Sequence, residues 1–466
     1  MKLYKPGSVA CAKQINGASF LFFGQEDTGI LTTVTYLKLS SFVYSLTNIT
    51  SLAIPYILKD TLLLSPAQVG IFSALCSAPA FLKPVAAIFI PASQRPLILS
   101  ICPLIQTAAY LGIGLAISKG AASAPLVIGF MFAHSVASSI GMVLRDTLTV
   151  ESATVLESSS AAHRFFADLS MIQRIGLLPV SYLSGYLLSH VSPGRLILYS
   201  AIFPAIMAAA ASTLKSDYKN RQIDAKLQIQ KALEIISDSK KGLLSTVSGR
   251  GLFTCIVPSV SDAMFFFYTQ ELGLTPEFLG RFQLLGAVGG IAGISFSRLM
   301  ADFINPRSLA NIATVLQVPL FFSTVFLTSH MHLGISTTSF ILIRHFLIDF
   351  LLSLTSVPAS VQLAKTAPEG AQGAYLSLVG TLGDVGGFTN SLISSATMAA
   401  YGIDRTHFSS LTDMVIVCNS MYAGLVPALF YYDEPSAPKK GVPQTLVDKS
   451  PKVEELMDDP SPVRDA

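Results

Sequence analysis

About twelve long apolar stretches follow one another between residues 34 and 431, separated by short polar turns. A helix that crosses a lipid bilayer needs roughly 20 apolar residues, and it satisfies its backbone hydrogen bonds internally. The stretches predict an all-α membrane protein with about 12 transmembrane helices, near residues 34–58, 67–92, 96–118, 123–147, 163–190, 194–214, 248–272, 276–303, 308–330, 334–364, 372–400 and 408–431.

The composition supports this class and argues against others. Apolar residues make up 51% of the chain and charged residues 13%, against about 25% charged residues in a soluble domain. The net charge of +3 is too small to suggest a nucleic-acid partner. No cysteine pair has CxxC spacing, and no nucleophile, base and orienting group occur together. We therefore expect neither an enzyme nor a metal or cofactor site.

A charged segment from Lys215 to Lys241 divides the apolar stretches six and six. This pattern predicts a polar tail at 1–33, a six-helix bundle at 34–214, a loop at 215–247, a second bundle at 248–431 and a disordered tail at 432–466. The Lys and Arg residues of the loop favour the cytoplasmic side. Residues 1–30, basic and without an acid until Glu26, fit either an organellar targeting segment or a cytosolic tail.

The segment from Val257 to Arg281 contains the strongest candidate for a functional residue. Read as one helix, it places four side chains on one face: Ser259, Asp262, Phe266 and Thr269. An acidic side chain inside an apolar helix is costly unless it is paired or faces water. Asp262 is therefore a candidate substrate or proton site. A structural ion pair with a cation on a neighbouring helix is the alternative.

The fifth apolar stretch places Ser170, Arg174 and Ser181 along one stripe. An arginine in such a stretch is expected to face protein or a water-filled cavity. Arg174 could receive a substrate carboxylate through two parallel hydrogen bonds. A salt bridge with Asp146 or Asp262 inside the protein is equally compatible with the sequence.

The tenth stretch contains three titratable residues, Arg344, His345 and Asp349. His345 and Asp349 are four residues apart, so their side chains can meet on one helical face. Such a pair could couple transport to protons, because histidine titrates near neutral pH. A purely structural pair is the alternative.

The residues PSVSDAMFFFYTQELG, followed by PEFLGR, resemble the matching segment of the folate-biopterin transporter family, a branch of the major facilitator superfamily. Tyr56 to Asp60 and Leu363 to Gly387 are similar to other parts of the same family. The resemblance implies two six-helix bundles that rock around a midplane site, and secondary transport of folates or pterins, in symport with an ion such as the proton. It also implies a location in the plasma membrane or the plastid envelope.

Other residues match the family less completely. Asp146 and Glu151 resemble its D-x-x-x-x-E pattern, which implies a gating or proton-coupling role, although solvated charges at a helix end would look the same. Lys83 matches a Lys-Pro of the family, or reaches along its stem to the membrane interface. Ala87 and Pro91 stand where the family has Gly and Asp. This departure leaves two alternatives open: a carrier of another organic solute, and a transport-inactive sensor or scaffold.

The chemistry of a folate suggests roles for these residues. Asp262, with Phe266 or Tyr268, could bind the amino-amide edge and the flat ring of a pterin. Arg174, Arg344 and Lys83 are candidates for the carboxylates of the glutamate tail. We expect the carrier to act as a monomer in the lipid bilayer.

Two rows of glycines occur in the eighth and eleventh stretches. No strand precedes them and no GK[ST] follows, so a nucleotide-binding loop is excluded. Both rows predict close helix packing. Asp384, among the glycines of the second row, is a candidate to line a cavity. The rows are Gly286, Gly289, Gly290 and Gly293 in the eighth stretch, and Gly380, Gly383, Gly386 and Gly387 in the eleventh.

Overall fold

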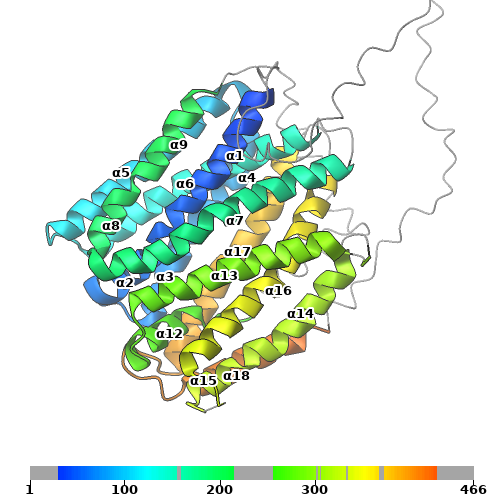
Figure 1. Cartoon of the computed structure of the whole chain (residues 1–466). Coiled ribbons are helices and arrows are strands. Elements are labelled where there is room, and N and C mark those ends of the chain that lie inside the picture. The colour runs from blue at the N-terminus through cyan, green and yellow to red at the C-terminus, as the bar shows by residue number, and fades with distance from the viewer. Residues whose placement is uncertain are drawn as a thin grey trace, which may run out of the picture.

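The computed structural model describes residues 30–154, 159–214, 256–300, 303–304, 306–331, 334–366 and 372–427. Every regular element in these residues is helical, and the helices form one elongated bundle of rods (Figure 1). Eight helical stretches in this part are long and apolar enough to cross a membrane. Where the residues are described, each predicted apolar stretch coincides with a helix or a string of shorter helices, so the predicted all-α fold class is confirmed.

The first bundle contains six helical rods, several of them interrupted. In chain order its elements are α1 (Ile30–Leu46), η1 (Thr47–Thr50), α2 (Ala53–Tyr56), η2 (Ile57–Thr61), α3 (Pro66–Ser77), η3 (Ala78–Leu82), α4 (Lys83–Phe89), η4 (Ala92–Gln94), α5 (Arg95–Ser118), α6 (Ala124–Thr154), α7 (Ser159–His190), α8 (Pro193–Ser200) and α9 (Ile202–Ser212).

The second bundle has the same plan. In the part that the structure describes, its elements are α12 (Ser261–Phe266), η7 (Phe267–Glu271), α13 (Pro276–Met300), α14 (Pro306–Phe322), α15 (Thr324–Thr328), α16 (Thr337–Thr366), α17 (Gln372–Ala400) and α18 (Leu411–Leu425). The predicted central loop, 215–247, the whole predicted C-terminal tail and residues 1–29 of the N-terminal tail lie outside the described residues.

The rods alternate in direction, which gives the molecule two ends. We call the end with the turns at 62–65 and 272–275 the outer end, and the end with the turn at 90–94 the inner end. These names follow from the predicted cytoplasmic position of the central loop.

One turn occurs twice, at the outer end of each bundle. In the first bundle the π-helix η2 leads through Leu63, whose φ is 54°, to the N-cap Ser65 and Pro66. In the second, the π-helix η7 leads through Gly273, whose φ is 59°, to Thr275 and Pro276. The backbone bonds also match: Leu64 N to Leu58 O and Leu274 N to Tyr268 O are both 2.9 Å. The two halves therefore share an internal repeat.

The bundles touch along two seams near the outer end. Along one, α7 packs against α13 (Figure 1), and a side chain on Gly185 would meet the backbone of Gly280 at 2.7 Å. Along the other, α3 packs against α17, and a side chain on Gly70 would overlap Ser395. Gly70 and Gly280 each lie four residues after the repeated proline, so the two seams are built by equivalent positions.

The largest hydrophobic core cluster also joins the two bundles. Ile57 and Tyr110 of the first bundle and Phe267 and Leu411 of the second belong to this one buried cluster. The core therefore closes the outer end as a single packed layer.

Candidate substrate and coupling site

The seventh rod is broken just before Asp262. Residues 258–260 are not helical, and Pro258 has no backbone N–H to donate. The side chain of Asn390 donates to the carbonyl of Val257, and the Ser259 N–H donates to Ser394 Oγ at 2.7 Å. Helix α17 therefore satisfies the backbone that the break exposes. The expected continuous helical face from Ser259 to Thr269 was wrong, because the break and the π-helix change the side-chain period.

Asp262 lies in the first turn of α12, directly after this break. It is half-buried, and within the described part of the chain its carboxylate makes no hydrogen bond or ion pair. The alternative of a structural ion pair therefore has no support among these residues. Interrupted helices are the usual framework of a substrate site in a two-bundle carrier.

The two aromatic residues predicted beside Asp262 are buried in contacts with other helices. Phe266 is 1% exposed and packs with Leu58 and Phe72 of the first bundle. The Tyr268 ring is buried and packs edge-to-face with Phe282, at a centroid distance of 6.0 Å. Both rings take part in closing the outer end.

Arg174 extends from α7 to the second bundle. Its Nη2 donates to Ser353 Oγ of α16 at 3.3 Å, and its guanidinium lies over Gly290 of α13. Asp349 lies within its electrostatic field. The alternative salt bridges with Asp146 or Asp262 are not formed among the described residues.

His345 and Asp349 meet as the sequence predicted. His345 Nε2 lies 3.2 Å from Asp349 Oδ2, and the imidazole stacks on Phe282 with ring centroids 3.6 Å apart. Both polar groups lie over Gly286, where a Cβ atom would come within 2.6 Å of Asp349 Oδ2. The pair and Arg174 therefore form one polar group of residues on the glycine face of α13.

The two glycine rows have different environments. In α13, the four predicted glycines face α16 or Arg174 at close range, which confirms the predicted packing. In α17 the prediction was wrong for three of the four glycines, because a Cβ atom on Gly380, Gly383 or Gly387 would meet no heavy atom within 4 Å, while Gly386 is buried. These three positions, spaced three and four apart, leave open space along one face of α17.

Lys83 and Asp384 connect the bundles nearer the inner end. The Lys83 ammonium lies 2.7 Å from Asp384 Oδ2, and Lys83 is 7% exposed. The alternative in which Lys83 reaches to the membrane interface was therefore wrong. Asp146 lies in the electrostatic field of both residues. Ala87, which stands where the family has glycine, is buried in one apolar cluster with Val143, so the extra methyl group has space at this position.

Arg344 and Glu151 have partners within their own bundles. Arg344 Nε donates to Leu320 O at 3.1 Å, and its Nη2 donates to Thr324 Oγ1. It thus satisfies the backbone where α14 ends and α15 begins. Glu151 accepts two bonds from Arg95 Nη1, at 2.8 and 3.0 Å, and so ties the inner ends of α6 and α5.

Sequence reasoning missed one polar residue at the junction of α7 and α13. The Gln283 amide oxygen accepts bonds from Ser51 Oγ at 3.1 Å and from Ser184 Oγ at 3.3 Å, so it links both bundles. Its position, among apolar residues of the eighth stretch, was a signal that could have found it.

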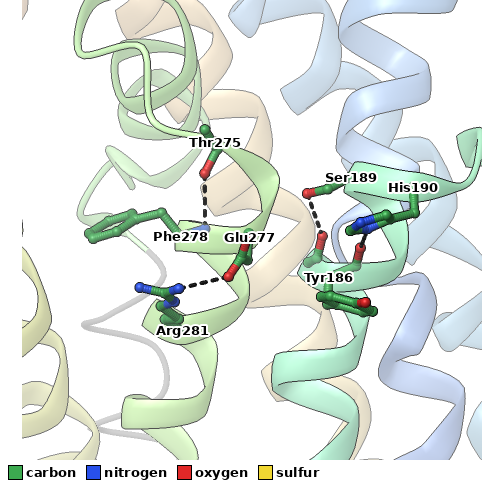
Figure 2. Close-up of polar contacts among 8 residues, drawn as sticks. Tyr186, Ser189, His190, Thr275, Glu277, Phe278 and Arg281 are labelled. Atoms are coloured by element: carbon green, nitrogen blue, oxygen red, sulfur yellow. Dashed lines mark hydrogen bonds and ion pairs between the residues drawn. The ribbon is translucent and has the colours of Figure 1, made fainter.

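Figure 2 shows the outer ends of α7 and α13, where Arg281 donates to Glu277 at 2.7 Å and His190 contacts Tyr186 O at 2.8 Å.

Comparison with known proteins supports the same architecture. The chain is 28% identical over 390 residues to "Folate transporter 2" of Plasmodium falciparum, covering 80% of this chain and 82% of that protein. It is 28% identical over 403 residues to the "Folate-biopterin transporter" of Synechocystis, covering 83% and 80%. The crystal structure of the nucleoside transporter NupG superposes with a TM-score of 0.60 at 13% identity, covering 86% and 98%.

The likeness to NupG establishes the fold alone, and the family follows from the sequence. The sequence model of the BT1 family matches residues 46–437, which include all of the second bundle and the first bundle after α1. This chain therefore belongs to the BT1 family and is a multi-pass membrane transporter with the two-bundle major facilitator fold, and not an enzyme.

Proposed function

We propose that this protein carries folates or pterins across its membrane by alternating access between the two bundles, with Asp262 as a recognition group for the substrate. The observation that carries the proposal is the half-buried Asp262 carboxylate beside the break in the seventh rod, with no partner in the described chain. The names of the relatives from Plasmodium falciparum and Synechocystis supply the substrate class.

The chemistry of a pterin fits such a carboxylate. Its amino-amide edge presents two N–H donors side by side, which one carboxylate accepts as a pair of charge-assisted hydrogen bonds. A buried carboxylate left without a partner is costly, so binding would remove that cost. The face of α17 at Gly380, Gly383 and Gly387 carries no side chains and has open space beside it, so a flat ring could lie against the helix there.

Arg174 is the arginine best placed for a glutamate tail. Its hydrogen bond to Ser353 Oγ is long, at 3.3 Å. A substrate carboxylate would replace that contact with a bidentate pair. Arg344 and Lys83 already bind strong partners and are left out of the proposed contact set.

Uptake of labelled folic acid by vesicles containing the purified protein tests the assignment. Asp262→Asn removes the charge at nearly constant shape, and we expect initial uptake to fall by at least about tenfold, since a charge-assisted hydrogen bond contributes about 1.5–3 kcal/mol. Asp413→Asn, at an exposed aspartate in the first turn of α18, is the matched control and should leave uptake unchanged. Normal uptake by Asp262→Asn would exclude the recognition role. No uptake of folates or pterins by folded wild-type protein would exclude the function.

A pH gradient across the same vesicles tests proton coupling by His345 and Asp349. Wild-type uptake should rise when the gradient is applied. His345→Gln removes the titratable ring and breaks the 3.2 Å contact with Asp349, so we expect the stimulation to disappear while folate exchange without a gradient persists. Stimulation that survives in both His345→Gln and Asp349→Asn would show that the coupling group lies elsewhere.

A further inference from the structure

The first bundle contains a cavity that is separate from the seams between the bundles. Its volume is about 40 Å³, it opens to its surroundings, and every lining residue comes from α1, η1, α5, α6 or α9. Pro103 and Pro204 lie in its wall. Pro103 lies inside α5, where proline removes a backbone hydrogen bond and crowds the preceding turn.

An arginine lines this cavity without an anionic partner. The Arg145 guanidinium lies over the Tyr44 ring, 4.6 Å from its centroid, and both residues line the cavity. Among the described residues its side chain makes no hydrogen bond and no ion pair. The neighbouring Asp146 lies within its field but forms no ion pair with it. This cation–π contact with Tyr44 holds the guanidinium at the wall of the cavity.

Two further polar side chains in the wall also lack partners in the described chain. Gln106 and Ser138 line the cavity, and neither side chain makes a hydrogen bond there. Ser138 is unlike most hydroxyl residues of these rods, such as Thr107 and Thr147, which donate to the carbonyl four residues earlier. A cation, an amide and a hydroxyl therefore border one space, while Met142 and Met207 provide apolar walls.

We propose that this cavity is a second ligand site, distinct from the transport path, that binds the carboxylate or phosphate group of an amphipathic anion. Arg145 receives the anionic oxygens, Gln106 and Ser138 complete their hydrogen bonds, and the methionines contact the apolar body. The site reaches the inner half of the bundle, since Tyr36, Leu99 and Met207 in its wall lie near the inner ends of α1, α5 and α9. Two sources have this chemistry: a soluble organic acid and the headgroup of an anionic lipid.

The absence of tryptophan from the chain allows a direct test. Met142 lines the cavity and is 39% exposed, so Met142→Trp places a single indole fluorophore at its edge. We titrate this variant with benzoate in zwitterionic nanodiscs, and separately compare zwitterionic nanodiscs with nanodiscs containing phosphatidylglycerol. Saturable change with benzoate identifies a soluble acid as the ligand class, and change only with phosphatidylglycerol identifies a lipid headgroup. Either result supports the site.

Arg145→Gln in the Met142→Trp background supplies the decisive comparison. Loss of a charge-assisted pair should weaken binding about tenfold or more, and Arg145→Lys should recover only part of it, because lysine lacks the planar pair of donors. Arg195→Gln, at an exposed arginine of α8 in the same bundle, is the control and should bind as the parent does. No saturable change with either ligand, or an equal change in folded Arg145→Gln, overturns the proposal. Folate uptake is measured alongside, so that failure of this site is distinguished from failure of transport.

Discussion

The Lys83 ammonium nitrogen lies 2.7 Å from Asp384 Oδ2 and thereby joins α4 of the first bundle to α17 of the second. The contact connects residues 301 positions apart in the chain. With Lys83 only 7% exposed, breaking the pair leaves a charge in a poorly hydrated place. The pair therefore holds the bundles together, and a movement that separates α4 from α17 must break it.

Removing one partner of this pair should destabilise the protein. We expect Lys83→Met to lower the free energy of unfolding by about 3 kcal/mol, because Asp384 is left without its cation. The double variant Lys83→Met with Asp384→Leu should recover most of the loss, since no buried charge then remains. Chemical unfolding in detergent micelles measures both values.

An exposed ion pair provides the control. The ion pair of Arg281 and Glu277 on α13 (Figure 2) is also 2.7 Å long, but the Arg281 side chain is 59% exposed. Arg281→Met should cost less than about 1 kcal/mol. A double variant as unstable as Lys83→Met would show that the lost stability comes from packing and not from the uncompensated Asp384 charge.

The contact of Gly185 with Gly280 should set whether the outer end can close. A Cβ atom at position 280 would lie 2.8 Å from Tyr182 O and 3.0 Å from Gly185 Cα. We expect Gly280→Val to hold α7 and α13 apart at this end and to reduce uptake about tenfold or more. Spin labels at His190 and Gln270, in a cysteine-free background, should report a longer distance than in the parent protein.

Gly129→Val is the matched control for this experiment. Gly129 has no neighbouring heavy atom within 4 Å of a Cβ position, so valine there should leave both uptake and the label distance unchanged. An unchanged distance in Gly280→Val would show that the seam adapts to the added side chain.

Arg344 should contribute to stability and not to substrate affinity. Its bonds to Leu320 O and Thr324 Oγ1 satisfy groups at the interruption between α14 and α15. Lysine cannot reproduce both bonds, so Arg344→Lys should lower the free energy of unfolding by about 1–3 kcal/mol. The dissociation constant for folate, measured by equilibrium binding, should change less than about twofold.

Arg298→Lys serves as the comparison for Arg344→Lys. The Arg298 contact with Asp168 is 3.5 Å long and its side chain is 35% exposed, so its replacement should have little effect on stability. A tenfold weaker affinity for folate in Arg344→Lys would instead place Arg344 in the substrate site.

The positions of the helices could be predicted because membrane spans are set by length and composition. The interruptions could not be predicted in the same way. Pro258 was a local signal for the break before Asp262, but the bonds that stabilise it come from Asn390 and Ser394, far along the chain. The repeated turn at Ser65-Pro66 and Thr275-Pro276 was visible in the sequence and was overlooked.

The candidate site was predicted in part. His345 and Asp349 could be paired because four residues along a helix bring two side chains to one face. Lys83 could not be paired with Asp384, because no local rule relates two residues on different bundles. The sequence cannot distinguish a buried arginine that binds a ligand from one that donates to a backbone carbonyl. Arg344 was therefore a candidate for the substrate site, whereas in the structure it donates to Leu320 O. Arg145 was not considered as a site, since its relation to Tyr44 depends on the packing of α1 against α6.

The two outer seams have a mechanical consequence. If the bundles met along one line only, each could swing, twist or slide about that line, and three independent motions would have to be controlled. Contacts at the equivalent positions Gly70 and Gly280 fix two lines instead of one. While both lines hold, the bundles retain essentially one way to move, a rocking about the two lines that opens the inner end; alternating access then requires both lines to separate together before the outer end opens. Glycine at each line lets the two helix backbones approach closely, so a small rotation about these contacts produces a large displacement at the opposite end of the bundles.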